Sequence, residues 1–197
     1  MTKPTDIRPI EATLYFLPVT TRVPLKFGPE TLTSVTCARV CLTVTDRRGR
    51  TAQGWGETPL SVQWVWPSAL PYRERHEALL DFTRRLAAAW AAFDANGHPL
   101  EVGHDFVTLV LPGLLAEANR QREGREPLPW LAALVCCSAY DLALHDAYGI
   151  LHGLPVYDTY GPAWMNRDLS AFLEPAANAE VRFADRYPQD YLSFPRA

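Results

Sequence analysis

One segment near the end of the sequence constrains the fold of this chain more than any other. The segment runs from Ser138 to Gly161 and reads SAYDLALHDAYGILHGLPVYDTYG. Its first half is an apolar run that carries two carboxylates, Asp141 and Asp146, and it predicts a buried helix. The Gly-Leu-Pro-Val-Tyr phrase that follows has the glycine and the proline that end a helix. The sequence therefore predicts a buried helix with a defined exit.

The composition is that of an ordinary globular domain. Hydrophobic residues make up 48% of the 197 residues and charged residues 21%, which suits one core in one domain, or one domain with a tail. The net charge of −3 is not that of a protein that binds nucleic acid. No apolar run approaches the roughly 18–20 residues that cross a bilayer, and the N-terminus lacks the pattern of a secretion signal. We therefore expect a cytoplasmic protein with neither nucleic-acid nor membrane partners.

Three stretches in the first third of the chain have the pattern of strands. Glu11–Val19 is short, apolar and aromatic, Ser34–Thr45 alternates, and Arg50–Glu57 returns after the turn at Asp46–Gly49. Between the first two, Thr20–Thr33 contains two prolines and a glycine and predicts a long loop. The sequence thus predicts an antiparallel meander whose apolar face needs a cover. One face of its second strand carries Thr36, Ala38, Val40, Leu42 and Val44.

The rest of the apolar pattern is helical. Pro71–Phe93 has apolar residues three and four apart, His104–Arg120 is interrupted by Pro112-Gly113, and Pro129–Gly149 predicts a third helix. The final stretch, Trp164–Ala197, has no sustained period and is typical of a linker or insert that packs against something else. Strands followed by helices predict an α+β fold: a three-stranded antiparallel meander, a helical bundle and an irregular C-terminal tail. The stripe expected on the third helix is Leu131, Leu134, Val135, Ser138, Leu142 and Asp146.

Three motifs, in order along the chain, resemble those of one enzyme family. They are the loop RVPLKFG at Arg22–Gly28, the strand end GWGETPL at Gly54–Leu60, and the helix and exit at Ser138–Gly161. Over residues 8–161 the chain resembles the N-terminal capping domain of the enolase superfamily, in the mandelate racemase and muconate lactonizing enzyme branch. The resemblance implies that residues 162–197 are a linker or insert ahead of a catalytic (β/α) barrel.

The resemblance implies a division of labour between two domains. In such enzymes the cap supplies two loops that close over the barrel mouth and help to choose the substrate. They correspond here to about Thr20–Thr33 and Thr58–Pro67. The barrel does the chemistry: its carboxylates hold Mg²⁺, which stabilises an enediolate, and a lysine or histidine base removes the proton α to a carboxylate. The whole enzyme would be a magnesium-dependent lyase or isomerase of a small carboxylate or sugar acid.

The length of the chain argues against catalysis by this polypeptide alone. A barrel of this kind needs at least about 200 residues, far more than follow Gly161. The two lysines of the chain, Lys3 and Lys26, cannot form a Lys-x-Lys base motif. We therefore expect a truncated cap with no catalytic residue, metal ligand or cofactor of its own, the Mg²⁺ belonging to the absent barrel.

Five side chains in the two expected loops are candidates for substrate contact. Arg22 and Lys26 would meet a substrate carboxylate or hydroxyl groups, or would be solvated loop cations. Phe27 would either close over an apolar part of a ligand or anchor its loop to the core. Trp64 and Trp66 would form a pocket wall or an interface, or would be buried in the core.

The other polar groups favour structural roles. Glu57, which follows Gly54 and Gly56, is expected to accept backbone N–H bonds at the strand end rather than to act as a general base. Asp141 and His145 lie four residues apart on one helix face, where such a pair can tune a base, but we expect a pair at the surface that the barrel would cover. The four cysteines lack metal-binding spacing and are expected to be reduced and largely buried.

Three hypotheses of function remain open from the sequence. The chain is a stand-alone or truncated cap, a fragment of a complete magnesium-dependent enzyme, or a binding module that reuses the candidate loop residues. The first predicts a barrel chain as partner, or self-association through apolar area around the Leu131–Tyr148 helix and the 161–197 tail. The third predicts a monomer that binds carboxylates.

Overall fold

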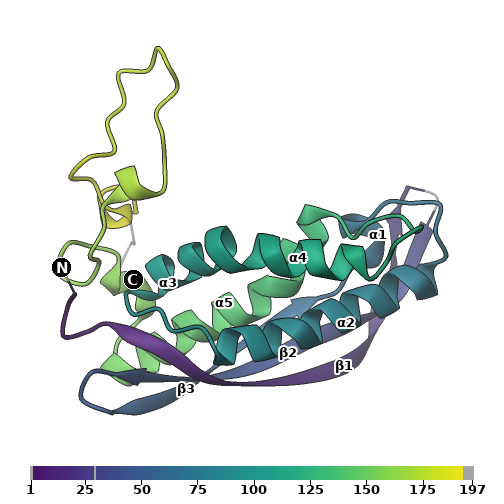
Figure 1. Cartoon of the computed structure of the whole chain (residues 1–197), viewed down its shortest axis with the longest axis horizontal. Coiled ribbons are helices and arrows are strands. Elements are labelled where there is room, and N and C mark those ends of the chain that lie inside the picture. Colours follow the sequence, from purple (N-terminus) through teal and green to yellow (C-terminus); the bar gives the residue numbers. More distant parts are fainter. Residues whose placement is uncertain (1, 29, 193–197) are drawn as a thin grey trace.

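The computed structural model describes residues 2–28 and 30–192 of the chain. Its sheet has three antiparallel strands in the order β1-β2-β3, formed by Ile7–Phe27, Glu30–Asp46 and Thr51–Pro59. Figure 1 shows the helices layered over this sheet, with the long helix α5 running beneath α3 and α4. The expected α+β fold, strands first and helices after, is confirmed.

The prediction of a long loop over residues 20–33 is wrong, because most of this segment is the outer part of the β1–β2 hairpin. Leu25 pairs with Leu32 beyond a register shift, and Gly28 turns the chain with a φ of 57°, which glycine adopts without strain. Pro24 lies within the irregular stretch, where its missing N–H interrupts no regular pair. The prolines and the glycine thus correctly indicated a turn in this segment, but the turn is much shorter than the predicted loop. We call residues 20–33 the hairpin arm.

The inner face of β2 forms the floor of the core. As the alternation predicted, Ala38, Val40, Leu42 and Val44 have no exposed surface. On the other face Glu57 pairs with its cross-strand neighbour Arg39, whose Nη2 lies 2.6 Å from the carboxylate. The expectation that Glu57 accepts backbone N–H bonds is therefore wrong, since a side chain supplies the donor.

Strand β3 packs directly against the backbone of α5, which spans Trp130–His152. A Cβ added at Gly54 would lie 2.1 Å from a backbone atom of α5, and one added at Gly56 would also lie 2.1 Å from such an atom. The two glycines thus permit the close backbone approach. Asp146 strengthens this contact, because its carboxylate accepts the backbone N–H of Trp55 at 2.8 Å.

The stripe expected on α5 is not the side that faces the sheet. Leu131 and Leu142 are 42% and 50% exposed, and Asp146 is exposed as well. The buried side carries mostly small residues, because the backbone of β3 lies too close for larger ones. Apolar surface is therefore exposed along α5, as expected from the sequence. The buried residues of α5 are Ala132, Ala133, Cys136, Cys137, Ala139, Tyr140, Ala143, Leu144, Ala147, Tyr148 and Gly149.

Helix α2 covers the rest of the sheet. It spans Tyr72–Ala91, close to the expected bounds, and its apolar stripe is buried. Trp90, near its end, stacks on Phe106 with ring centroids 4.0 Å apart. This stack joins α2 to the next helical layer. Its buried apolar residues are Leu79, Phe82, Leu86 and Trp90.

The expected interruption near Pro112 takes the form of a π-helical turn. This turn, η1 (Phe106–Val110), connects α3 (Pro99–Asp105) to α4 (Leu111–Arg120) without a gap. Pro112 lies in the first turn of α4, where its missing N–H breaks no α-helical bond. The helix pair therefore starts earlier than expected and bends instead of breaking.

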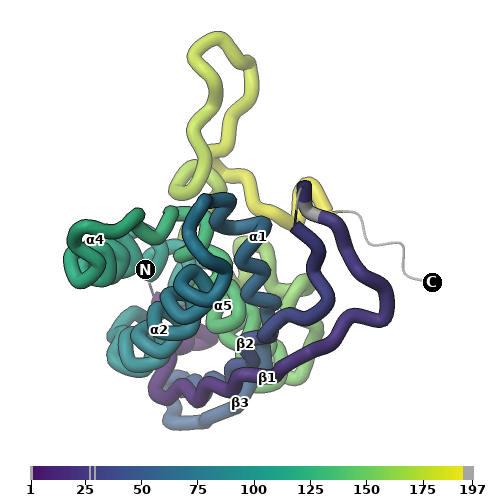
Figure 2. The backbone as a smooth tube through the Cα atoms, turned by 90° about the vertical axis from the view of Figure 1, so that its right-hand side faces the viewer, coloured from purple at the N-terminus to yellow at the C-terminus, as the bar shows by residue number. Residues whose placement is uncertain are grey.

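The segment after α5 is irregular, as expected, with short 3₁₀ turns η2 (Val156–Thr159), η3 (Leu169–Ala171) and η4 (Pro188–Asp190). Figure 2 shows that the stretch between η3 and η4 projects away from the body as a loop. Leu173 and Val181 on this loop are 46% and 51% exposed. The domain boundary at residue 161 stays a prediction.

The first part of this tail is docked on α3 by a buried carboxylate. Glu101 is 3% exposed, and its Oε1 accepts the backbone N–H groups of Asn166 and Arg167 at 2.6 and 2.7 Å. Its Oε2 accepts the side-chain amide of Asn166 at 2.8 Å and the backbone N–H of His98 at 3.1 Å. The start of α3 therefore fixes where the chain runs after α5.

Candidate functional site

The two specificity loops expected from the sequence lie at the same end of the molecule. The hairpin arm and the short helix α1 (Val62–Val65) share the end away from the docked tail (Figure 1). Arg75 of α2, which is 3% exposed, connects them. Its Nη1 donates to the carbonyl of Trp66 at 2.7 Å, and its Nη2 donates to the carboxylate of Glu30 at 3.3 Å. We call the hairpin arm, α1 and Arg75 the loop end.

Sequence reasoning does not identify Arg75, although the sequence contains a signal for it. Arg75 lies four residues before Leu79 and so belongs to the apolar stripe of α2. A charged residue on a buried stripe needs partners elsewhere in the fold. Which partners it finds depends on the sheet and on α1, and the helix pattern alone does not give them.

The loop end exposes two cations. Arg22 and Lys26 are both exposed, and no ion pair joins either of them to another residue that the structure describes. Val23 and Leu25 beside them are 67% and 49% exposed. Phe27 ends β1, and its side chain lies outside the described residues. The arm thus presents positive charge on a partly apolar surface.

The two tryptophans of the second loop have different environments. Trp64 is 54% exposed, whereas Trp66 is 1% exposed. The Nε1–H of Trp66 donates to Glu126 at 2.7 Å, and the guanidinium of Arg122 lies 5.1 Å from the centre of a Trp66 ring. Trp66 therefore takes the core position, the second of the two alternatives expected for it, and anchors the loop. The short helix α1 thus leaves the ring of Trp64 exposed and places the ring of Trp66 in the core.

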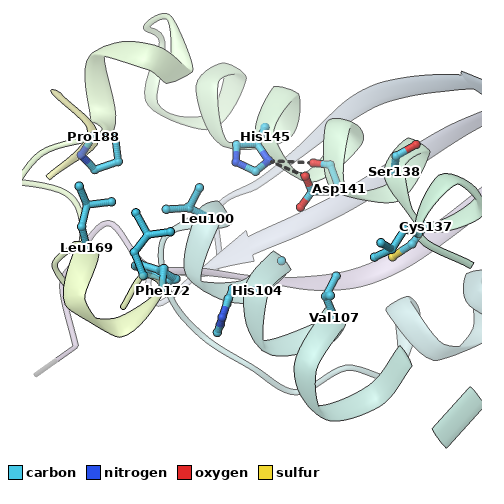
Figure 3. Close-up of a pocket in the computed structure, with 13 residues that line it drawn as sticks. Leu100, His104, Val107, Cys137, Ser138, Asp141, His145, Leu169, Phe172 and Pro188 are labelled. Atoms are coloured by element: carbon cyan, nitrogen blue, oxygen red, sulfur yellow. Dashed lines mark hydrogen bonds and ion pairs between the residues drawn. The ribbon is translucent and has the colours of Figure 1, made fainter. Parts of the chain in front are cut away.

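A groove lies between α3–η1 and α5 (Figure 3). Its volume is about 490 Å³, and the docked tail closes one side of it. We call it the α3–α5 groove. The apolar walls include Leu100, Val107, Leu134, Leu169, Phe172 and Pro188, and the polar groups are His104, Ser138, Asp141 and His145.

The Asp141–His145 pair expected from the helix spacing lies in this groove. Nδ1 of His145 is 2.9 Å from the backbone carbonyl of Asp141 and 3.7 Å from its carboxylate. Enclosure by the helices raises the pKa of the Asp141 carboxyl above its ordinary value, and His145 partly offsets this rise. Although 43% of the Asp141 side chain is accessible, no hydrogen bond of a described residue reaches its carboxylate.

Gly103 of α3 makes room for this carboxylate. A Cβ at position 103 would lie 2.2 Å from Oδ1 of Asp141, so any larger residue would displace it. The carboxylate therefore rests against the backbone of the facing helix. His104, the next residue, packs edge-on against the ring of Phe172 in the tail, with centroids 5.0 Å apart. The carboxylate of Asp141 thus lies between α5, which carries it, and α3.

Among the described residues, no group of three or more His, Cys, Asp or Glu side chains could hold a metal ion. The four cysteines are free and buried, as expected, and burial raises the pKa of Cys136 to about 12. No helix in the described part of the chain is long and apolar enough to span a membrane.

The sequence matches no protein-family model and no curated protein. The fold is similar to a mandelate racemase/muconate lactonizing enzyme-like protein from Rubrobacter xylanophilus, with 22% identity and a TM-score of 0.38, over 78% of this chain and 33% of that one. It is also similar to a dipeptide epimerase from Enterococcus faecalis V583 in complex with Mg and a dipeptide, with 14% identity and a TM-score of 0.44, over 79% and 35% of the two chains.

A third similar structure is L-talarate dehydratase from Polaromonas sp. JS666, with 13% identity and a TM-score of 0.40, over 75% of this chain and 33% of that one. The chain thus spans about a third of the length of the solved structures that it matches. At these identities the likeness concerns the fold alone. The similar structures include mandelate racemase/muconate lactonizing proteins, the branch whose capping domain the sequence motifs resemble.

Proposed function

We propose that this chain is the capping and substrate-specificity domain of a mandelate racemase or muconate lactonizing-type enzyme that works in the cytoplasm. The barrel would come from polypeptide outside these residues, either continuous with them or on a separate chain. The loop end carries the proposal. Arg75 joins the hairpin arm to the α1 turn, and Arg22, Lys26 and Trp64 are exposed at this end.

The chemistry of the loop end suits an acid as substrate. The guanidinium of Arg22 can hold a carboxylate through two parallel hydrogen bonds, and the ammonium of Lys26 offers a second, more compact charge. Trp64 adds an apolar surface for the rest of the molecule. The proposed substrate is therefore a small carboxylate or sugar acid. Bound in the barrel, magnesium would stabilise the negative charge that forms when the α-proton leaves.

The test joins this chain to a barrel and follows the choice of acid. A chimera places the chain ahead of the barrel of the Rubrobacter protein, and NMR measures exchange of the α-proton for a panel of acids in D₂O with Mg²⁺. We expect the preferred acid to change with the cap. Because each cation contributes a charge-assisted hydrogen bond, Arg22→Gln and Lys26→Gln should each raise KM about tenfold or more, with a smaller effect on kcat.

A matched control comes from α2. Arg84 is an exposed arginine paired with Asp81 on the same helix, so Arg84→Gln removes a positive charge away from the loop end. We expect this variant to leave KM unchanged. An active chimera whose acid preference and KM do not respond to the cap, to Arg22→Gln or to Lys26→Gln would contradict the proposal.

A further inference from the structure

Two polar groups of the α3–α5 groove, Asp141 and His145, present hydrogen-bond acceptors. The backbone carbonyl of Asp141 has no hydrogen to give, so Nδ1 of His145 must donate to it, at 2.9 Å. In the neutral ring this leaves Nε2 as an acceptor. The carboxylate of Asp141, in its ionised form, is also an acceptor, and Figure 3 shows the two side chains turned toward each other in the groove. A ligand that contacts this pair must therefore bring donors.

The charge of the groove sharpens this requirement. No hydrogen bond from a described residue reaches the Asp141 carboxylate, and its enclosure between the helices raises the pKa of this carboxyl. Arg167 of the tail does not pair with it, because both carboxylate oxygens of Asp105 hold the Arg167 guanidinium, at 2.8 and 3.0 Å. A positive charge entering the groove would pair with the Asp141 carboxylate, whereas an anion would be repelled.

The walls of the groove define the rest of the ligand. Seven apolar residues from α3, η1, α5 and the tail surround about 490 Å³, within the range of small-molecule sites. Phe172 offers a ring surface beside the opening (Figure 3). Such walls suit a compact hydrocarbon or aromatic body attached to the charged head.

We propose that the α3–α5 groove is a binding site for a small organic cation: a primary amine on an apolar body. The ammonium donates to the Asp141 carboxylate and to Nε2 of His145, and the apolar body lies along Leu134 and Phe172. Gly103 is part of the site, since only a residue without a side chain leaves the carboxylate in place. The site is separate from the loop end and does not depend on the capping role.

The test compares three probes of one shape that differ in their head group. Isothermal titration calorimetry of the full chain uses 2-phenylethylamine, 2-phenylethanol and 3-phenylpropionate. We expect the amine to bind at least about tenfold more tightly than the alcohol, because one ion pair is added, and the carboxylate not to bind. Equal affinity for the amine and the alcohol, or binding of the carboxylate, would overturn the proposal without any variant.

Variants then locate the amine in the groove. Asp141→Asn keeps the shape of the side chain and removes its charge, and it should weaken amine binding about tenfold while affinity for the alcohol stays constant. The matched control is Asp81→Asn, an exposed carboxylate of α2 that pairs with Arg84. Thermal unfolding of both variants shows whether they fold. An amine affinity unaffected by Asp141→Asn would place the amine elsewhere and sink the proposal. The chimera experiment does not change Asp141, and the amine titrations do not change the loop end. A failure of one proposal can therefore be distinguished from a failure of the other.

Discussion

The two ends of the molecule are each held by one buried ion, and the two ions are satisfied to different degrees. Glu101, beneath the docked tail, accepts four hydrogen bonds from three residues. Arg75, at the loop end, donates two, and its buried Nε has no partner among the described residues. A saturated buried ion fixes the groups around it, whereas a partly satisfied one holds them less firmly. We therefore expect the tail end to be a rigid platform and the loop end to be more mobile.

Removal of the saturated ion should have the largest effect. In Glu101→Ala, the backbone N–H groups of His98, Asn166 and Arg167 lose their acceptor in a buried place. We expect the free energy of unfolding to fall by about 3–5 kcal/mol, since each stranded donor costs about 1–3 kcal/mol and water will reach some of them. Urea denaturation followed by circular dichroism measures this loss.

The control for this variant is Glu117→Ala. Glu117 lies on α4, and its carboxylate accepts hydrogen bonds from the surface side chains of Arg120 and Gln121. Its removal should change the free energy of unfolding by no more than about 0.5 kcal/mol. If the two glutamates prove equally dispensable, the tail is not held by Glu101, and the contrast between the two ends disappears.

The stability of the tail end should also depend on pH, because of His98. This residue has no exposed surface; its Nδ1 accepts the N–H of Leu100 at 3.2 Å and its Nε2 lies 2.8 Å from Oγ1 of Thr159. Burial, followed by the charges of His145 and His152, lowers the pKa of His98 to about 3. In the unfolded chain the same group binds a proton below about pH 6.5. Between these values the unfolded state holds more protons, so stability falls as the pH falls.

The measurement isolates His98 with a variant that does not titrate. In His98→Asn, the side-chain oxygen can still cap α3 by accepting the N–H of Leu100, although the contact with Thr159 is lost. The wild type should therefore be the more stable protein at pH 7.5. Its advantage should shrink by about 2 kcal/mol between pH 7.5 and pH 5, as the linkage relation requires. A constant difference across this range would show that His98 takes up a proton in the folded state.

The fold was predictable where the pattern is local. The alternation of β2 predicted Ala38, Val40, Leu42 and Val44 as one face, and the spacing of α2 predicted its core stripe. On α5 the leucines suggested the wrong face, because the sheet side is filled by small residues. The two glycines of β3 bring a strand backbone against that helix. The face that α5 buries is decided by β3, a strand about 90 residues earlier in the sequence. The hydrophobic periodicity of α5 alone does not show which face that is.

The candidate site was predictable only in part, for the same reason. Arg22, Lys26 and Trp64 could be proposed from motifs within loops, and they are exposed at the loop end. Whether Trp66 is buried could not be decided from the sequence, because its partner, Glu126, lies 60 residues away in a surface loop. Asp141 and His145 were recognised as a helix pair, but the groove around them also needs α3 and the tail. Pairs within one element are visible in the sequence, and sites assembled from several elements are not.

The loop end should give the smallest change in stability and the clearest change in motion. Arg75→Met keeps an unbranched side chain within the apolar stripe of α2 and removes both hydrogen bonds. Because the Nε of Arg75 is already without a partner, the loss in unfolding free energy should be only about 1 kcal/mol. Hydrogen exchange of the arm amides at residues 25–27 and 31–32 should nevertheless accelerate about tenfold, while the amides at 38–44 of β2 keep their protection.

A conservative variant distinguishes the hydrogen bonds of Arg75 to the loop end from its packing in the core. Arg75→Lys keeps the charge but cannot reach the Trp66 carbonyl and Glu30 together through a planar fork, so it should restore only part of the protection of the arm. Arg85→Met, on the same helix with its guanidinium on surface Gln121, should change neither stability nor exchange. If Arg75→Met instead lowers stability as much as Glu101→Ala and exposes the whole sheet, then Arg75 supports the core. The loop end would then be as rigid as the tail end, and the freedom that we ascribe to the hairpin arm would need another source.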